Sequence, residues 1–204
     1  MRIIGGNLRG KKILNPTDKS TRPLKDMVRE SIFNIIEHSK NEYVELNNAK
    51  VLDLFSGTGS FGIECLSRGA KKVIFFENYI NSIKILKKNL DLLNLNKQSN
   101  IIEKDAYNIT QSQNKLLKFD LIFLDPPFKD NKLNQLILKI KQMKITSKNT
   151  LIIIHRNKKI SENISEDLVI SKEKNYGLSK IIFGKFIKLI FSLFHFLLVL
   201  LLVD

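Results

Sequence analysis

Residues 125–128 read Asp-Pro-Pro-Phe and combine groups that can hold a planar ring bearing an amino group. They directly follow residues 119–124, an apolar run that predicts a strand. Prolines lack an N–H group and favour an extended turn, so we expect the carbonyl of Pro126 to be a free acceptor. The carboxylate of Asp125 is a second acceptor, and Phe128 offers an aromatic face. This set predicts chemistry on an exocyclic amine, although Asp-Pro also begins many simple turns.

A glycine turn follows a second apolar run, residues 51–55, which predicts a buried strand. Gly57 and Gly59 predict a tight turn into a helix, where the backbone can approach a ligand closely and the first N–H groups lack partners. Asp53 lies inside the strand, where a carboxylate favours a cationic ligand and disfavours a pyrophosphate. Glu77 ends the next apolar run, twenty residues after Gly57. The turn therefore predicts a site for a nucleotide-like ligand that carries positive charge.

Apolar runs and amphipathic stretches alternate along the rest of the chain, as a parallel α/β sheet requires. The pattern predicts strands over residues 51–55, 72–77, 100–104, 119–124 and 150–154, then an antiparallel hairpin over 168–171 and 179–186. It predicts helices over residues 25–36, 80–93 and 133–143. Ligands of open α/β sheets bind at the carboxyl ends of the strands. We therefore expect the glycine turn and residues 125–128 to lie at the same edge.

Length and composition limit the class of protein. A chain of 204 residues suits one catalytic domain, and a formal charge of +14 favours a polyanionic partner such as nucleic acid. The single cysteine, Cys65, excludes an internal disulfide, fits a reducing compartment and is expected to be buried. His38, His155 and His195 have no carboxylate or cysteine at a useful spacing, so we expect them to be surface or structural residues and expect no metal site.

Two sequence blocks resemble the start of the RsmD family. Residues 2–10 read Arg-Ile-Ile-Gly-Gly-Asn-Leu-Arg-Gly, and residues 22–34 read Arg-Pro-Leu-Lys-Asp-Met-Val-Arg-Glu-Ser-Ile-Phe-Asn. The glycine turn, with its Asp-x-Phe-x-Gly-x-Gly pattern, looks like motif I of the Rossmann-like methyltransferases. The RsmD family methylates the N2 amine of a guanine in small-subunit (16S) ribosomal RNA. The resemblance extends over residues 2 to about 186.

The resemblance implies a Rossmann-like methyltransferase fold with a mostly parallel seven-stranded sheet, and S-adenosylmethionine as the cofactor. In it, Asp53 and the glycine turn face the methionine part, Glu77 binds the ribose hydroxyls and Asp105 lies beside the adenine, where it can also cap a helix. The implied cofactor-binding residues are Asp53, Phe55, Ser56, Gly57, Gly59, Glu77, Asp105 and Ala106. The implied catalytic residues are Asp125, Pro126, Pro127 and Phe128.

The N-terminal residues are strongly basic and predict an arm with a short hairpin that lies along a phosphate backbone, or else a solvated basic tail. The predicted RNA-binding residues are Arg2, Arg9, Lys11, Lys12, Arg22, Lys25 and Arg29. Residues 1–40 are thus expected to contact RNA and residues 41–186 to form the methyltransferase domain. A base inside a duplex cannot reach the predicted pocket, so the target base must be unpaired or flipped.

Several functional alternatives stay open. The pocket residues suit adenine N6 or cytosine N4, in RNA or DNA, as well as guanine N2. Gly57-x-Gly59-x-x-Gly62 also fits a dinucleotide fingerprint and hence a nicotinamide-dependent oxidoreductase. A third alternative is a non-catalytic RNA-binding protein on a decayed methyltransferase fold. We expect a cytoplasmic monomer that acts on ribosomal RNA, within a small-subunit particle.

The last residues, 187–204, differ from the rest, because 189–203 are apolar except for Ser192 and His195. The stretch is shorter than the roughly twenty residues of a spanning helix. A membrane tail anchor, an apolar extension packed on the domain or a partner, and a translated frame error are equally compatible with it.

Overall fold

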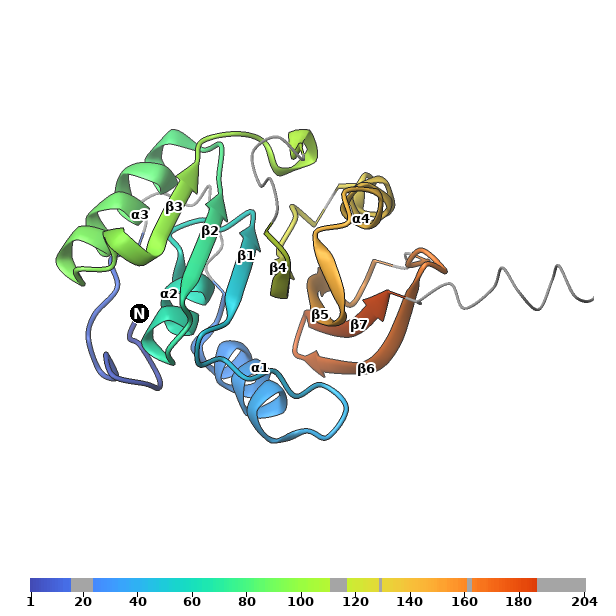
Figure 1. The fold of residues 1–204 in the computed structure, drawn as a ribbon, viewed down its shortest axis with the longest axis horizontal. Helices are drawn as coiled ribbons and strands as arrows, with labels where there is room; N and C mark the ends of the chain where they lie inside the picture. Colours follow the sequence, from blue (N-terminus) through green and yellow to red (C-terminus); the bar gives the residue numbers. More distant parts are fainter. Residues whose placement is uncertain (16–23, 111–116, 129, 161–162, 187–204) are drawn as a thin grey trace, which may run out of the picture.

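The computed structural model of this chain describes residues 1–15, 24–110, 117–128, 130–160 and 163–186. Seven strands within these ranges form one sheet (Figure 1). They are β1 (Lys50–Leu54), β2 (Lys72–Phe76), β3 (Ser99–Ile102), β4 (Phe119–Leu124), β5 (Thr146–Asn157), β6 (Leu168–Tyr176) and β7 (Ser179–Phe186). The helices are α1 (Asp26–His38), α2 (Ser60–Ser67), α3 (Ile80–Leu92) and α4 (Leu133–Gln142), with short 3-10 helices η1 (Asn96–Gln98) and η2 (Ala106–Asn108).

The strands lie in the order β3-β2-β1-β4-β5-β7-β6. β1 pairs in parallel with β2 and β4, and β3 and β5 continue the parallel sheet on either side. β7 pairs antiparallel with both β5 and β6. The predicted mostly parallel α/β sheet with a C-terminal antiparallel hairpin is therefore confirmed.

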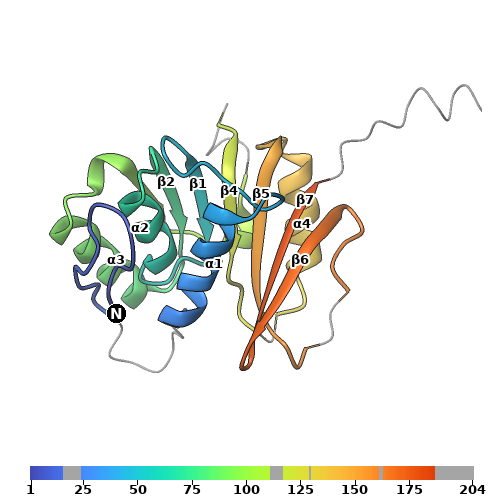
Figure 2. The same cartoon turned by 90° about the horizontal axis from the view of Figure 1, so that it is seen from below.

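Helices cover both faces of the sheet, because neighbouring strand residues point to opposite faces. One apolar cluster joins α1, α2 and α3 to residues such as Val51 and Phe123. The other joins α4 to residues such as Leu52 and Ile122. In Figure 2, α1 crosses in front of the strands and α4 lies behind β5 and β7. Cys65 of α2 is buried, as predicted.

β5 is longer than the apolar pattern predicted. The pattern ended at Ile154, but the strand continues through His155 and Arg156 to Asn157. These polar residues stay in the strand because each pairs with a residue of β7, His155 with Ile181 and Arg156 with Lys180. Backbone pairing with β7, which the apolar pattern of β5 does not reveal, therefore extends β5 beyond its apolar run.

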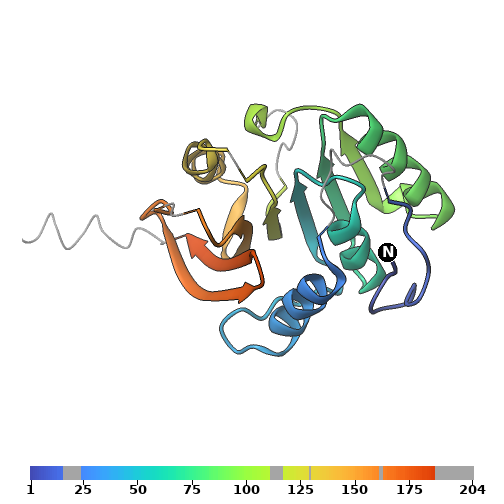
Figure 3. The same ribbon diagram turned by 180° about the vertical axis from the view of Figure 1, so that it is seen from behind.

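The predicted N-terminal hairpin is present and is docked on the domain. Arg2 and Lys12 form an antiparallel bridge, and Ile3 and Ile13 are buried in the cluster that contains α1. Figure 3 shows this segment, in dark blue, beside α2 and α3 and far from β6. Residues 187–204, and with them the predicted tail, lie outside the described residues. Each helix within the described ranges is too short or too polar to cross a membrane.

Candidate active site

The carboxyl ends of β1 and β4 lie side by side, with Leu54 paired to Leu124. The chain leaves β1 toward β2 on one side and leaves β4 toward β5 on the other. This is the topological switch point at which open α/β sheets bind ligands. The backbone N–H of Asp125 donates to the Leu54 carbonyl at 3.2 Å, so the loops after both strands start at one point.

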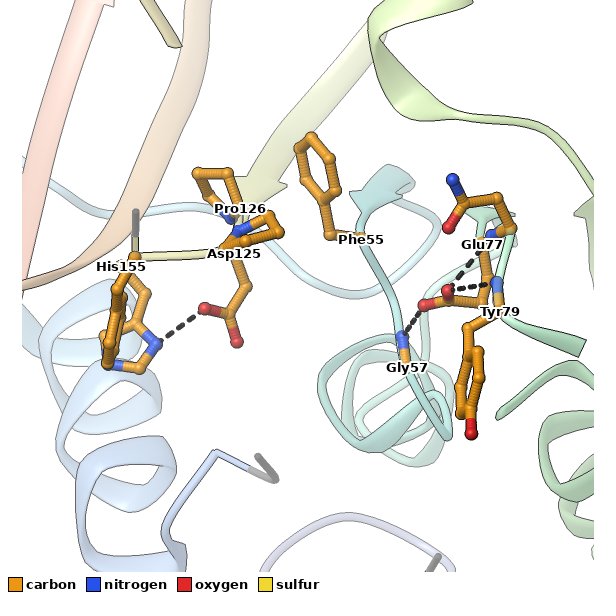
Figure 4. A pocket seen from close by; sticks show the side chains of 10 residues that line it. Phe55, Gly57, Glu77, Tyr79, Asp125, Pro126 and His155 are labelled. Atoms are coloured by element: carbon orange, nitrogen blue, oxygen red, sulfur yellow. Dashed lines mark hydrogen bonds and ion pairs between the residues drawn. The ribbon is translucent and has the colours of Figure 1, made fainter. Parts of the chain in front are cut away.

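A cavity of about 400 Å³ opens at this point, a size typical of small-molecule sites. Figure 4 shows Phe55 between two groups of side chains, with Asp125, Pro126 and His155 on one side and Glu77 and Tyr79 on the other. The lining residues are Phe55, Gly57, Glu77, Asn78, Tyr79, Asp125, Pro126, Pro127, Phe128 and His155. The structure thus brings together the two motifs that the sequence predicted to share an edge.

The glycine turn needs glycine for two different reasons. Gly57 has φ 56°, in the left-handed region, and a Cβ atom there would meet open space, so its backbone faces the cavity. Gly59 has φ 83°, and a Cβ atom there would lie 2.3 Å from Cδ1 of Leu86 on α3. The hydroxyl of Ser56 donates to the Phe76 carbonyl at 3.2 Å and ties the turn to β2. Ser56 and Gly59 therefore shape the turn from outside the cavity lining.

Backbone N–H groups hold the carboxylate of Glu77. One oxygen accepts from Gly57 at 2.6 Å, and the other accepts from Asn78 at 3.0 Å and Tyr79 at 2.8 Å. The carboxylate still lines the cavity, and each oxygen has more than one lone-pair direction. Glu77 is therefore fixed in place and can accept further hydrogen bonds from a ligand, as predicted for ribose hydroxyls.

Asp53 lies beneath the glycine turn and does not line the cavity. It is buried, and its Oδ2 accepts from the Gly62 N–H at 3.0 Å, while Oδ1 has no hydrogen-bond partner among the described residues. Burial raises the pKa of the Asp53 carboxyl well above its ordinary value, and the nearby charge of Asp125 acts in the same direction. A cation in the adjoining cavity would counteract both effects, so the residues of this half fit a sulfonium-bearing cofactor.

Asp105 is found in the role of a helix cap. Its Oδ1 accepts from the Tyr107 N–H at 3.0 Å at the start of η2, and neither Asp105 nor Ala106 lines the cavity. The ring of Tyr107 lies 5.1 Å from that of Phe55, which connects this loop to the cavity wall. Contact of Asp105 and Ala106 with the adenine of a cofactor stays a prediction.

His155, which the sequence analysis expected to be a surface or structural residue, is buried and lines the cavity. Its Nδ1 lies 2.8 Å from Oδ1 of Asp125, and its ring packs edge-on against Phe128 with centroids 5.4 Å apart. His38 is exposed, and His195 lies outside the described residues. Spacing along the chain gave no hint of the Asp125 contact, because the two residues meet only through the pairing of β4 with β5.

Arg156 was also missed by the sequence analysis. It is buried, and its guanidinium donates to the Pro127 carbonyl at 3.1 Å and to the Asp130 carbonyl at 2.8 Å. Among the described residues, none donates to the carbonyl of Pro126, which agrees with its predicted role as a free acceptor. Their place at the site could have been found, though not their partners, since His155 and Arg156 directly follow the apolar run 150–154 at the same edge as Asp125.

The predicted RNA-binding residues divide into two groups. Those that are exposed are Arg2, Arg9, Lys11, Lys12 and Lys25, whereas Arg22 lies outside the described residues. Arg29 is fully buried, so the prediction that it faces RNA was wrong. Its guanidinium lies 3.1 Å from Asp26 and 3.7 Å from the buried carboxylate of Glu64, and also donates to the Arg2 carbonyl. Arg29 thus pairs with a buried charge where α1, α2 and the hairpin meet.

Comparison with known proteins places the chain among methyltransferases. The model of the family described as "Conserved hypothetical protein 95" matches residues 1–185. The chain belongs to this family. The Bacillus subtilis (strain 168) protein named "Putative rRNA methyltransferase YlbH" is 35% identical over 182 residues, which cover 88% of this chain and 95% of that protein. Ribosomal RNA small subunit methyltransferase D of Haemophilus influenzae is 33% identical over 179 residues, which cover 87% and 90%.

The fold has a counterpart of known structure. The Escherichia coli structure titled "Putative methyltransferase yhhF" aligns with a TM-score of 0.74 and 26% identity over 91% of this chain and 97% of that chain. The predicted resemblance to the RsmD family and the predicted Rossmann-like methyltransferase fold are both confirmed. Within the described ranges, no group of three or more His, Cys, Asp or Glu side chains is arranged to hold a metal ion.

Proposed function

We propose that this protein transfers a methyl group from S-adenosylmethionine to the N2 amine of a guanine in small-subunit ribosomal RNA. The observation that carries the proposal is the pair of acceptors at Asp125 and Pro126, across one cavity from the anchored carboxylate of Glu77. Two relatives are named as ribosomal RNA methyltransferases, which supports RNA as the substrate class. The choice of guanine N2 rests on the family, because the cavity residues suit any exocyclic base amine.

The Glu77 side of the cavity would hold the cofactor. The carboxylate of Glu77 would accept hydrogen bonds from the ribose, the Gly57 backbone allows close approach, and a cation would favour the ionised form of the buried Asp53 carboxyl group. When bound, S-adenosylmethionine supplies an electrophilic methyl group on a positively charged sulfur. Phe55 lies between the two halves of the cavity and would flank both the cofactor and the acceptor base (Figure 4).

The Asp125 side would hold the amine. The carboxylate of Asp125 and the carbonyl of Pro126 accept its two N–H groups, and Phe128 lines the same wall, where it can stack on the base. Both acceptors favour a tetrahedral nitrogen whose lone pair points at the methyl carbon. The nitrogen–carbon bond forms as the carbon–sulfur bond breaks. The nitrogen then carries a positive charge and loses a proton to Asp125 or to water.

The target base must leave any duplex to reach this cavity. The exposed cations of the N-terminal hairpin and of Lys25 would bind the flanking phosphates, and a small-subunit particle would present the unpaired base. Action as a monomer stays a prediction.

Methyl transfer to ribosomal particles from cells that lack this enzyme tests the proposal. Purified protein and cofactor labelled on the methyl group should label one guanine at N2, and Asp125→Ala should abolish the label while cofactor binding persists. Label on adenine N6 or cytosine N4 would mean that the target amine belongs to that base and not to guanine. Cofactor binding without any transfer would favour an RNA-binding protein, and tighter binding of a nicotinamide cofactor would favour an oxidoreductase.

A further inference from the structure

His155 is held on both ring nitrogens within the candidate site. Nδ1 lies 2.8 Å from Oδ1 of Asp125, and Nε2 lies 2.9 Å from the hydroxyl of Ser179 at the start of β7. The histidine and the serine are nearly fully buried, whereas the side chain of Asp125 is 20% exposed toward the cavity. Figure 4 shows the imidazole beside the carboxylate on the side away from Glu77.

The hydrogen-bond pattern fixes the proton on the ring. An ionised carboxylate only accepts, so Nδ1 of His155 must carry the hydrogen that points to Asp125. The Nε2 of a neutral ring is then an acceptor, and the hydroxyl of Ser179 can donate to it. The carboxylate of Asp125 therefore selects the tautomer, and Ser179 holds the ring in place through Nε2. The other carboxylate oxygen, Oδ2, is left for a ligand in the cavity.

We infer that His155, oriented by Ser179, is a positioning residue that sets the Asp125 carboxylate for the acceptor amine. This inference rests on the proposed function. The terminal torsion of an aspartate is broad, so without a fixed partner the carboxylate would turn among several orientations. Attack on the methyl carbon requires the amine in a narrow range of directions, and an error of about 1 Å can cost about a hundredfold in rate. His155 itself touches neither reacting atom in this scheme.

Two substitutions at His155 test the role of its Nδ1–H. In His155→Asn the side-chain amide nitrogen occupies the position of Nδ1 and keeps a donor, whereas His155→Ala removes it. We expect kcat for methyl transfer to fall about tenfold or more in His155→Ala, with KM for RNA and Kd for cofactor unchanged, and to recover largely in His155→Asn. Equal kcat in His155→Ala and the wild type would overturn the inference, as would an equal loss in both variants.

A measurement that does not depend on activity examines the same contact. Nitrogen NMR of the wild type should show His155 with its hydrogen on Nδ1, the signal being assigned by its absence in His155→Asn. In Asp125→Ala the hydrogen should move to Nε2, because the carboxylate acceptor is gone while Ser179 can still accept. A wild-type ring with its hydrogen on Nε2 would overturn the inference even if methyl transfer is confirmed.

A matched control separates positioning from stability. Thr150 lies near the other end of β5, is equally buried and donates to the Phe119 carbonyl at 2.6 Å. Thr150→Val should lower Tm as much as His155→Ala does, yet leave kcat unchanged. If Thr150→Val lowers kcat to the same extent, the effect of His155 is one of stability and the inference fails. A wild-type protein that methylates no RNA base would instead remove the proposed function and, with it, this role.

Discussion

The two halves of the cavity are held in place by different means. Backbone N–H groups hold the carboxylate of Glu77, whereas the carboxylate of Asp125 is held by the side chain of His155. Backbone donors are present whatever the residue type, so the cofactor half depends mainly on the shape of the glycine turn. The acceptor half depends on particular side chains of β5. We therefore expect substitutions of His155 and Arg156 in β5 to impair transfer while cofactor binding persists, and substitutions at Glu77 to do the reverse.

The largest expected effect is at Asp125 itself. Asp125→Ala removes one of the two acceptors for the amine and should lower kcat by about a thousandfold, with Kd for cofactor changed by less than about threefold. Asp125→Asn keeps one acceptor oxygen and should retain an intermediate rate. Single-turnover transfer and calorimetric cofactor titration measure the two quantities. A large loss of cofactor affinity in Asp125→Ala would show that the halves are not independent.

Arg156 should have the next largest effect, because it holds two carbonyls of the loop after β4. Arg156→Met removes both hydrogen bonds and should lower kcat by about ten- to a hundredfold and destabilise the fold by about 1 to 3 kcal/mol. Chemical unfolding and methyl transfer measure these changes. Lys158→Met, an exposed neighbour on the turn after β5, is the control and should change neither. A loss of stability with unchanged kcat would refute the proposed support of the loop.

Glu77→Gln should produce the opposite pattern. The amide keeps one oxygen acceptor but places an NH2 group against backbone donors, so we expect cofactor Kd to rise by about tenfold while kcat at saturating cofactor stays near the wild-type value. Titration of cofactor without RNA gives its Kd, and titration of cofactor in the presence of RNA gives kcat at saturation. A fall in kcat at saturation would mean that Glu77 also orients the methyl group.

Asp53 should show the smallest effect, which depends on pH. Burial raises the folded-state pKa of Asp53, so the folded protein keeps a proton that the unfolded chain loses, and stability falls as pH rises above the unfolded value of about 4. Asp53→Asn removes the free-energy cost of burying this carboxyl group at high pH. It should raise Tm of the cofactor-free protein at pH 8 by about 2 to 4 °C. The gain should vanish near pH 3, where both side chains are neutral. A lower Tm at pH 8 would mean that the charge is stabilised in the folded state.

Much of the fold and half of the site could be predicted from the sequence. The glycine turn and residues 125–128 are local patterns, and apolar runs marked most strands, so their meeting at one edge followed from parallel pairing. His155 could not be assigned, because its partners lie on β4 and β7 and the apolar run ended one residue earlier. The prediction that Arg29 faces RNA was wrong for a related reason. A cation on an amphipathic helix looks exposed unless its buried partner, Glu64, is known from the packing of α2.

The position of β7 has a consequence for synthesis on the ribosome. β7 is the last strand in the described part of the chain, yet it lies between β5 and β6 and carries Ser179. A nascent chain that ends before residue 179 can pair β1 to β5, but the polar end of β5 then has no ladder partner and His155 has no second bond. The glycine turn lies wholly within the part of the chain made earlier. The second contact of His155 is added only when the final hairpin inserts beside β5.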